Sequence, residues 1–164
     1  MLREMNSELP DNYKKVYEDV KQDVHFANVD LEIWSKEDLQ IIFDEFGKNV
    51  LEMANFTFDN GNKLASFELS LELVNLNAEA NEMIKAFCSL IENFTNDAKI
   101  VWNNCYKKVF DVGFESGNTE KSFSTLLENQ TLKKVSEIGA EIVITIYPVL
   151  DYSIEIENNN QSGQ

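Results

Sequence analysis

The chain has very little of the residue types on which most catalytic and zinc sites depend. Its 164 residues include a single His, His25, and only two Cys, Cys88 and Cys105. A Ser-His-acid or Cys-His arrangement would have to use His25, which is far in sequence from either Cys. A structural zinc site usually takes four ligands drawn from Cys and His. We therefore expect no enzymatic activity, no bound metal and no other cofactor.

Long apolar runs and closely spaced Cys pairs are also missing. No window approaches the roughly 20 apolar residues of a membrane helix, and the N-terminal sequence MLREMNSELPDNYKK lacks the apolar stretch of a signal peptide. The two Cys do not have the spacing of a redox or zinc motif, and reduced core thiols are typical of the cytosol. These features predict a cytoplasmic protein that does not associate with membranes.

Positive charge is scarce: 14 Lys and Arg stand against 29 Asp and Glu, which gives a formal net charge of −15. The acidic residues are spread along the chain. A field of this sign repels nucleic acid and steers basic proteins toward the surface. Scattered charge that only keeps the protein soluble is the alternative explanation. We expect no nucleic-acid partner, and we expect any protein partner to be basic.

The length and the 43% hydrophobic content predict one compact domain with a core of its own, over residues 1–157. Residues 158–164, within the low-complexity sequence ENNNQSGQ, are predicted to form a disordered tail.

Residues 11–63 show four predicted elements. Apolar residues recur at helical spacing from Pro10 to Val24, which indicates a helix. Residues 25–34 alternate as a half-buried strand, with Val29, Leu31 and Ile33 on one side and Asp30 and Glu32 on the other. A helix follows from Ser35 and ends at Gly47. Asn60-Gly61 then lies between two alternating runs, a strong hairpin signal.

Residues 64–147 continue with further strands and helices. The second hairpin arm carries alternate apolar residues as far as Leu73, and a helix is predicted from Asn77 to Phe94. Residues 98–115 are long for one strand, so either a hairpin turning at Asn103-Asn104 or a single bulged strand fits them. A broken helix is predicted over 119–139. The strand 141–147 follows, with Ile142, Ile144 and Ile146 interpreted as core.

The order from residue 64 to residue 147 therefore reads strand, helix, strand, strand, helix, strand. This βαββαβ order predicts an α+β fold with a ferredoxin-like antiparallel sheet and helices packed on one face. Residues 11–63 are predicted to extend this core at its N-terminal side.

The closing sequence LKKVSEIGAEIVITIY, Leu132 to Tyr147, resembles a known pattern when it is taken with the strand GFE before it and SFELSLEL upstream. It is similar to domain-of-unknown-function family 4279, whose members close with a short helix, a Gly and an aliphatic strand ending in Tyr. The resemblance lies mainly in residues 64–147. The family's proline after the first helix is missing, since FGKNVLEM stands there. The resemblance implies a small intracellular α+β domain and assigns no functional residues.

We favour a non-catalytic binding protein, specifically an immunity protein that neutralises a basic toxin domain through acidic side chains and a few aromatic anchors. The alternative is a small-ligand or enzymatic module with Trp34, Trp102 or Tyr106 as pocket walls. Self-association through the edge of strand 141–147 also stays open. The candidate partner-binding residues are Asp30, Glu32, Glu37, Asp38, Glu68, Glu72, Glu141 and Tyr147.

Overall fold

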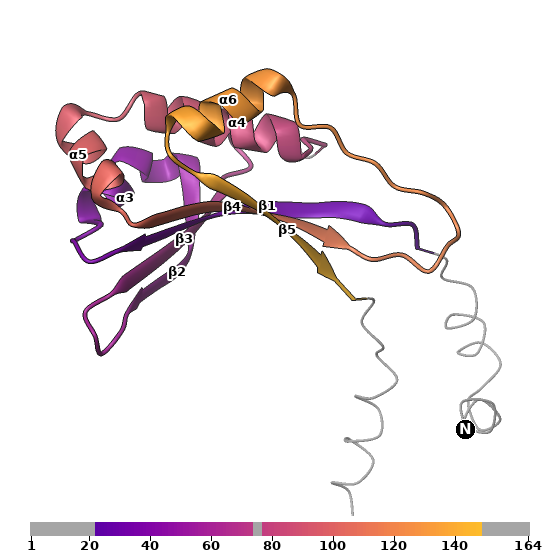
Figure 1. The fold of residues 1–164 in the computed structure, drawn as a ribbon, viewed down its shortest axis with the longest axis horizontal. Helices are drawn as coiled ribbons and strands as arrows, with labels where there is room; N and C mark the ends of the chain where they lie inside the picture. Colours follow the sequence, from indigo (N-terminus) through magenta and orange to yellow (C-terminus); the bar gives the residue numbers. More distant parts are fainter. Residues whose placement is uncertain (1–21, 74–76, 149–164) are drawn as a thin grey trace, which may run out of the picture.

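The computed structural model describes residues 22–73 and 77–148, which form a mixed five-stranded sheet with helices on one face (Figure 1). An α+β fold with helices on one face is thereby confirmed. The elements in chain order are β1 His25–Ser35, α3 Gln40–Phe46, the 3₁₀ turn η1 Gly47–Asn49, β2 Val50–Thr57, β3 Lys63–Leu69, α4 Ala80–Glu92, α5 Asn96–Asn104, β4 Lys107–Glu115, α6 Asn129–Glu137 and β5 Glu141–Tyr147.

The strands lie in the order β2-β3-β1-β4-β5, so β1 is central and β2 and β5 are the two edges. The β2–β3, β1–β3 and β1–β4 pairs are antiparallel, whereas β4 and β5 are parallel. The prediction of a purely antiparallel sheet is therefore wrong. The physical reason is α6, which carries the chain back along the sheet so that β5 enters in the same direction as β4.

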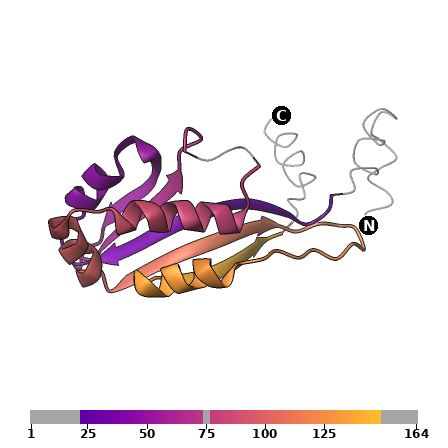
Figure 2. The same cartoon turned by 90° about the horizontal axis from the view of Figure 1, so that it is seen from above.

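The core lies between the sheet and the helices, and β1 supplies its centre. Val29, Leu31 and Ile33 point to the helix side and are fully buried, as their alternation predicts. Phe46, at the end of α3, joins the layers: its ring centroid lies 5.0 Å from Phe67 of β3 and 5.0 Å from Phe94. α4 and α6 lie side by side over the sheet (Figure 2).

The hairpin predicted at Asn60-Gly61 is present, and the helix predicted from Ser35 to Gly47 is present as α3. Gly61 turns the chain between β2 and β3 with a φ of 79°, a conformation that suits Gly because it lacks a Cβ. The second arm, β3, ends at Leu69 and not at Leu73 as predicted. Leu71 and Leu73 therefore lie in a turn and are exposed. The helix α4 begins at Ala80, three residues later than expected.

Residues 98–115 form neither the hairpin nor the single long strand expected from the sequence. Their first part belongs to α5, and only β4 is a strand. The hydroxyl of Thr95 caps α5 by accepting a hydrogen bond from the backbone N–H of Ala98. Ala98 and Trp102, four residues apart, are both buried on one helix face. The βαββαβ order consequently does not appear, because one strand stands where two were expected.

Two further predictions differ from the structure or lie outside it. The helix predicted over 119–139 is confined to α6, and residues 116–128 have no regular structure. The predicted N-terminal helix lies outside the described residues except at 22–24, which are not helical, and the predicted tail 158–164 also lies outside. No helix among the described residues is long and apolar enough to cross a membrane.

The side chains of β5 contradict one prediction. Ile142 is half-buried, but Ile144 and Ile146 are 60% and 65% exposed, so the expected core role of these two residues is wrong. All three point to the helix side, since Ile142 pairs with Phe110 and Ile144 with Val112. Because β5 is the edge strand, its later residues have neighbours on one side only.

Lys108 is a buried cation that ties α5 to β4. Its ammonium group donates hydrogen bonds of 3.2 Å to the carbonyl oxygens of Trp102 and Cys105 at the end of α5. It also lies 5.6 Å from the ring centroid of Trp102. A cation at a helix C-terminus satisfies carbonyls that have no partner within the helix and interacts favourably with the helix dipole.

We predict that Lys108→Met lowers the free energy of unfolding by about 1.5–3 kcal/mol, because two buried carbonyl oxygens lose a charged donor. The measurement is urea denaturation followed by circular dichroism. Lys107→Met is the matched control: Lys107 is exposed, with its ammonium group 5.8 Å from the ring centroid of Trp34, and should cost about 1 kcal/mol or less. Equal losses in the two variants would contradict the capping role of Lys108.

Candidate functional site

The sheet face opposite the helices brings together several acidic side chains. No helix among the described residues covers this face, as the view across the sheet shows (Figure 1). Alternation places Asn28, Asp30, Glu32 and Trp34 of β1 on it, since the intervening residues are buried under the helices. We call this surface the open face.

Four carboxylates, Asp30, Glu32, Glu68 and Asp111, form what we call the acidic cluster. Asp30 of β1 and Asp111 of β4 are directly opposite each other in the antiparallel pair. Like charges in opposite positions of neighbouring strands destabilise a sheet. The side-chain amide of Asn28 links Asp30 to Glu68, because its Nδ2 donates to Asp30 Oδ2 at 2.9 Å and to Glu68 Oε1 at 2.7 Å.

The pKa of Asp30 reflects both its burial and its acidic neighbours. Burial, the largest cause, and the charges of Glu68, Asp111 and Glu32 together raise it to about 6, against the hydrogen bond from Asn28. The pKa of Tyr147 is also raised, by burial and by the charges of Asp111 and other cluster members. Around neutral pH the cluster therefore holds negative charge in a place that disfavours it.

Gly113 leaves room for side chains that converge on the cluster. A Cβ at this position would lie 2.5 Å from Asn28 Oδ1 and 3.1 Å from Tyr147 Cε2. Next to it on β5, the hydroxyl of Thr145 donates to Asp111 Oδ1 at 2.6 Å. The open face thus contains a polar network, built from β1, β3, β4 and β5, with the phenol of Tyr147 at its border.

An apolar patch adjoins the acidic cluster on the β2 side. Trp34 stacks on Phe58, with ring centroids 5.8 Å apart, and Leu64 lies beside Trp34 on β3. Phe56 pairs with Leu64, and Leu51 pairs with Glu68 of the cluster. Leu51, Phe56 and Phe58 are all exposed. Acidic and apolar side chains therefore form one continuous surface.

The structure brings together half of the predicted partner-binding residues. Asp30, Glu32, Glu68 and Tyr147 lie on or beside the acidic cluster. Glu141 is on the same face but lies at the start of β5, where it pairs with Val109.

The other three predicted residues lie elsewhere and have partners of their own. Glu37 accepts a hydrogen bond from Asn104, Asp38 lies 3.6 Å from the ammonium of Lys63, and Glu72 lies 3.9 Å from that of Lys48.

Asp111 and Asn28 are the functional candidates that sequence reasoning missed. Asp111 lies in the run KKVFDVGFE, whose flanking residues Phe110 and Val112 are buried on the helix side. That alternation is visible in the sequence, but because a hairpin and a single bulged strand both fit residues 98–115, the sequence leaves open the face on which Asp111 lies. Asn28 has no local signal, because its role depends on Glu68, which is 40 residues away.

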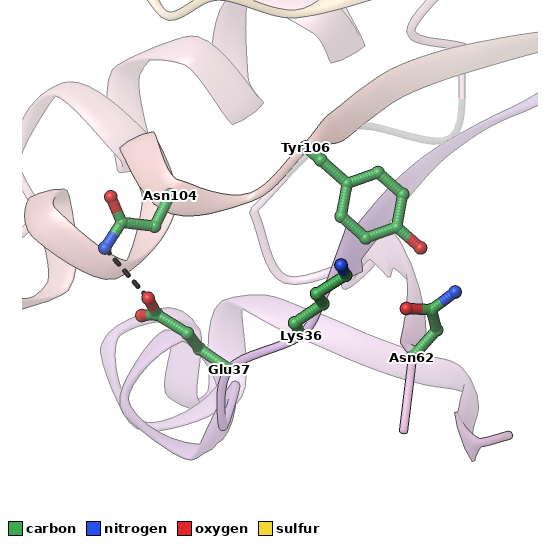
Figure 3. A pocket seen from close by; sticks show the side chains of 5 residues that line it. All are labelled: Lys36, Glu37, Asn62, Asn104 and Tyr106. Atoms are coloured by element: carbon green, nitrogen blue, oxygen red, sulfur yellow. Dashed lines mark hydrogen bonds between the residues drawn. The ribbon is translucent and has the colours of Figure 1, made fainter. Parts of the chain in front are cut away.

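A shallow hollow lies at one end of the sheet, among Lys36, Glu37, Asn62, Asn104 and Tyr106 (Figure 3). The Asn104–Glu37 hydrogen bond of 3.0 Å closes one side of it. Of the three predicted pocket walls, Tyr106 lines this hollow. Trp102 does not, because it is 2% exposed and donates its indole N–H to the carbonyl oxygen of Ile138. Trp34 lies on the open face. Within the described residues, the three predicted walls therefore do not converge on this hollow.

The residues that could carry nucleophilic chemistry are dispersed. His25, at the start of β1, lies with its Nε2 3.2 Å from Glu115 Oε2 and is exposed. Burial raises the pKa of both thiols, that of Cys88 to about 12, so neither is a reactive thiolate. Across residues 22–73 and 77–148, no three His, Cys, Asp or Glu side chains are arranged to hold a metal ion.

Comparison of the chain with family models, with curated protein sequences and with solved structures gives no match. The resemblance to domain-of-unknown-function family 4279 therefore stays a prediction from its closing motif. The candidate site depends on its geometry alone.

We predict that Asp30→Asn stabilises the protein in a pH-dependent way. The pKa of Asp30 is higher in the folded state than the ordinary value of 3.8, so the folded protein binds the proton more tightly. The stability that protonated Asp30 contributes is complete below pH 4 and is lost as pH rises through about 6. Asp30→Asn should thus gain about 1 kcal/mol more over wild type at pH 8 than at pH 5, after allowance for solvent screening.

Urea denaturation of both proteins at pH 5 and pH 8 measures this difference. Asp59→Asn, on the exposed turn between β2 and β3, is the matched control and should show the same difference from wild type at both pH values. A gain for Asp30→Asn that does not change with pH would show that the acidic cluster is not under electrostatic strain.

Proposed function

We propose that this protein is a small, acidic, non-catalytic binding domain of the cytoplasm, and that its open face binds a basic protein. The partner that fits best is a basic toxin domain, which the protein neutralises by contact as an immunity protein. The observation that carries the proposal is the acidic cluster, where Asp30 and Asp111 face each other across neighbouring strands on an uncovered face.

Repulsion within the cluster supports a cationic partner. Folding gains nothing from opposed carboxylates, whose repulsion costs stability. An Arg or Lys side chain placed among Asp30, Glu68 and Asp111 would relieve that repulsion and donate hydrogen bonds to their oxygens. Within the protein, Asn28 and Thr145 donate to the cluster, but neither carries a charge.

The apolar patch supports a protein partner over a small cation. Binding energy in protein interfaces is concentrated in a few aromatic or other large anchors surrounded by polar contacts. Leu51, Phe56 and Phe58 are exposed large hydrophobic residues next to the cluster, and Tyr147 borders it on the opposite side. The net charge of −15 adds long-range steering of a basic partner toward the protein.

A titration with an arginine hexapeptide, followed by two-dimensional amide NMR, tests whether cations bind at the cluster. We expect the largest chemical-shift changes at the amides of Asp30, Glu68, Asp111 and their strand neighbours. Shift changes spread evenly over the acidic residues of the whole surface would contradict the proposal, because they would indicate scattered charge that serves solubility.

The partner itself is tested by affinity capture from the native strain at low salt, with three baits. These are wild type, the cluster variant Asp30→Asn/Asp111→Asn, and the variant Asp59→Asn/Glu120→Gln, which loses the same charge from exposed loops. We expect a basic protein on wild type and on the loop variant. Its dissociation constant should rise at least tenfold, about 1.4 kcal/mol, on the cluster variant.

Neutralisation is then measured as rescue of growth when the captured protein is expressed together with each bait. Equal binding by the cluster and loop variants, or capture of no basic protein by wild type, would contradict the proposed function.

A further inference from the structure

The outer edge of β5 has the properties of a strand that pairs with another strand. Among the described residues, β5 pairs only with β4, and its register runs without a shift from Glu141 to Tyr147. The opposite edge strand, β2, differs because its register shifts between Glu52 and Ala54. Such irregularities, together with Lys and Pro residues, are the usual protection of sheet edges against pairing. β5 contains none of these, and Pro148 follows only after the strand ends.

The direction of the free backbone groups in β5 follows from one hydrogen bond. The carbonyl oxygen of Tyr147 accepts a bond of 2.8 Å from the backbone N–H of Ser116, which directly follows β4. The backbone groups of Tyr147 therefore point toward β4. Because these groups alternate between the two sides of a strand, those of Ile142, Ile144 and Ile146 point away from the sheet.

The same residues also offer apolar side chains. Ile144 and Ile146 are 60% and 65% exposed, and Ile142 is half-buried. The outward backbone groups and the exposed aliphatic side chains thus belong to one set of alternate residues. The strand has one charged residue, Glu141, at its end.

We propose that the outer edge of β5 pairs with β5 of a second copy of this chain, antiparallel and centred on Ile144. In this register Ile144 faces Ile144 of the second copy, and Ile142 faces Ile146 of the second copy. Each of these pairs can exchange both backbone hydrogen bonds, because all of the residues point their groups outward. The result is a continuous sheet through both copies, with the helices of both on one side.

The self-complementarity of the strand favours a second copy over a foreign strand. A twofold interface uses one surface patch twice, so the patch must match itself. In the proposed register, isoleucines meet isoleucines on the helix side, where cross-strand aliphatic contacts stabilise a sheet. Glu141 faces Tyr147 of the second copy, so the only carboxylates of the two strands are kept apart at opposite ends.

This dimer does not depend on the proposed function, and the two proposals predict opposite effects of ionic strength. Each chain has a net charge of −15, so two copies repel each other and higher ionic strength strengthens the dimer. Binding of a basic partner to the open face weakens under the same change.

Sedimentation velocity over a hundredfold range of concentration, at low and moderate salt, tests the dimer. We expect wild type to approach twice the chain mass of 18.8 kDa as concentration rises, with more dimer at higher salt. Ile144→Lys should raise the dimer dissociation constant at least tenfold, because it places opposed cations at the centre of the pair. Leu51→Lys is the matched control: Leu51 is 50% exposed on the other edge strand, and this variant should dimerise like wild type.

Hydrogen exchange of the wild-type protein gives a readout that needs no substitution. The amides of Ile142, Ile144 and Ile146 should become protected as concentration increases, while those of β2 do not change. Thermal denaturation shows whether Ile144→Lys folds, and Ile146→Lys is the second variant if it does not. A monomeric wild type at every concentration, or protection of these amides in a monomer, would overturn the proposal.

Discussion

The fixed register of β1, the central strand, is the constraint on which the rest of the structure depends. Val29, Leu31 and Ile33 are fully buried under the helices, and the alternate residues Asp30 and Glu32 must then face the other way. A slip of one residue would place these carboxylates in the core. Burial of an unpaired carboxylate is far more costly than loss of one apolar contact. The core therefore fixes the position of the acidic cluster.

Features with a local signal could be predicted from the sequence, and features set by distant segments could not. The alternation of β1 and the Asn60-Gly61 turn each depend on a few neighbouring residues, and both were predicted correctly. The parallel pairing of β4 and β5 has no such signal, because alternation shows which face a residue occupies but not the direction of the neighbouring strand. The helix α5 was missed because Val101 and Trp102 also fit a strand.

The candidate site shows the same division. Asp30 and Glu32 could be assigned to one face from their own strand, and Glu68 from its alternation with Phe67 and Leu69. Their convergence depends on which strands become neighbours. Glu37, Asp38 and Glu72 fit the sequence criteria equally well, but each lies near a residue from another segment that offers it a hydrogen bond or an opposite charge. Acidic residue type alone does not separate a solvated carboxylate from one held in a cluster.

The energetics of the fold do not account for the acidic cluster. The core is rich in aromatic contacts, since Phe46 alone packs on Phe67, Phe87 and Phe94, and burial of one such side chain stabilises by about 1.5–3 kcal/mol. Opposed like charges destabilise the fold by roughly 0.2–1 kcal/mol. The core can offset this loss, but the charged pair itself contributes no stability. A neutral residue at Asp30 or Asp111 would fit the same strand position. The charge on this face is therefore the feature that the proposed binding of a basic partner would explain, because a cation placed among these carboxylates relieves their repulsion.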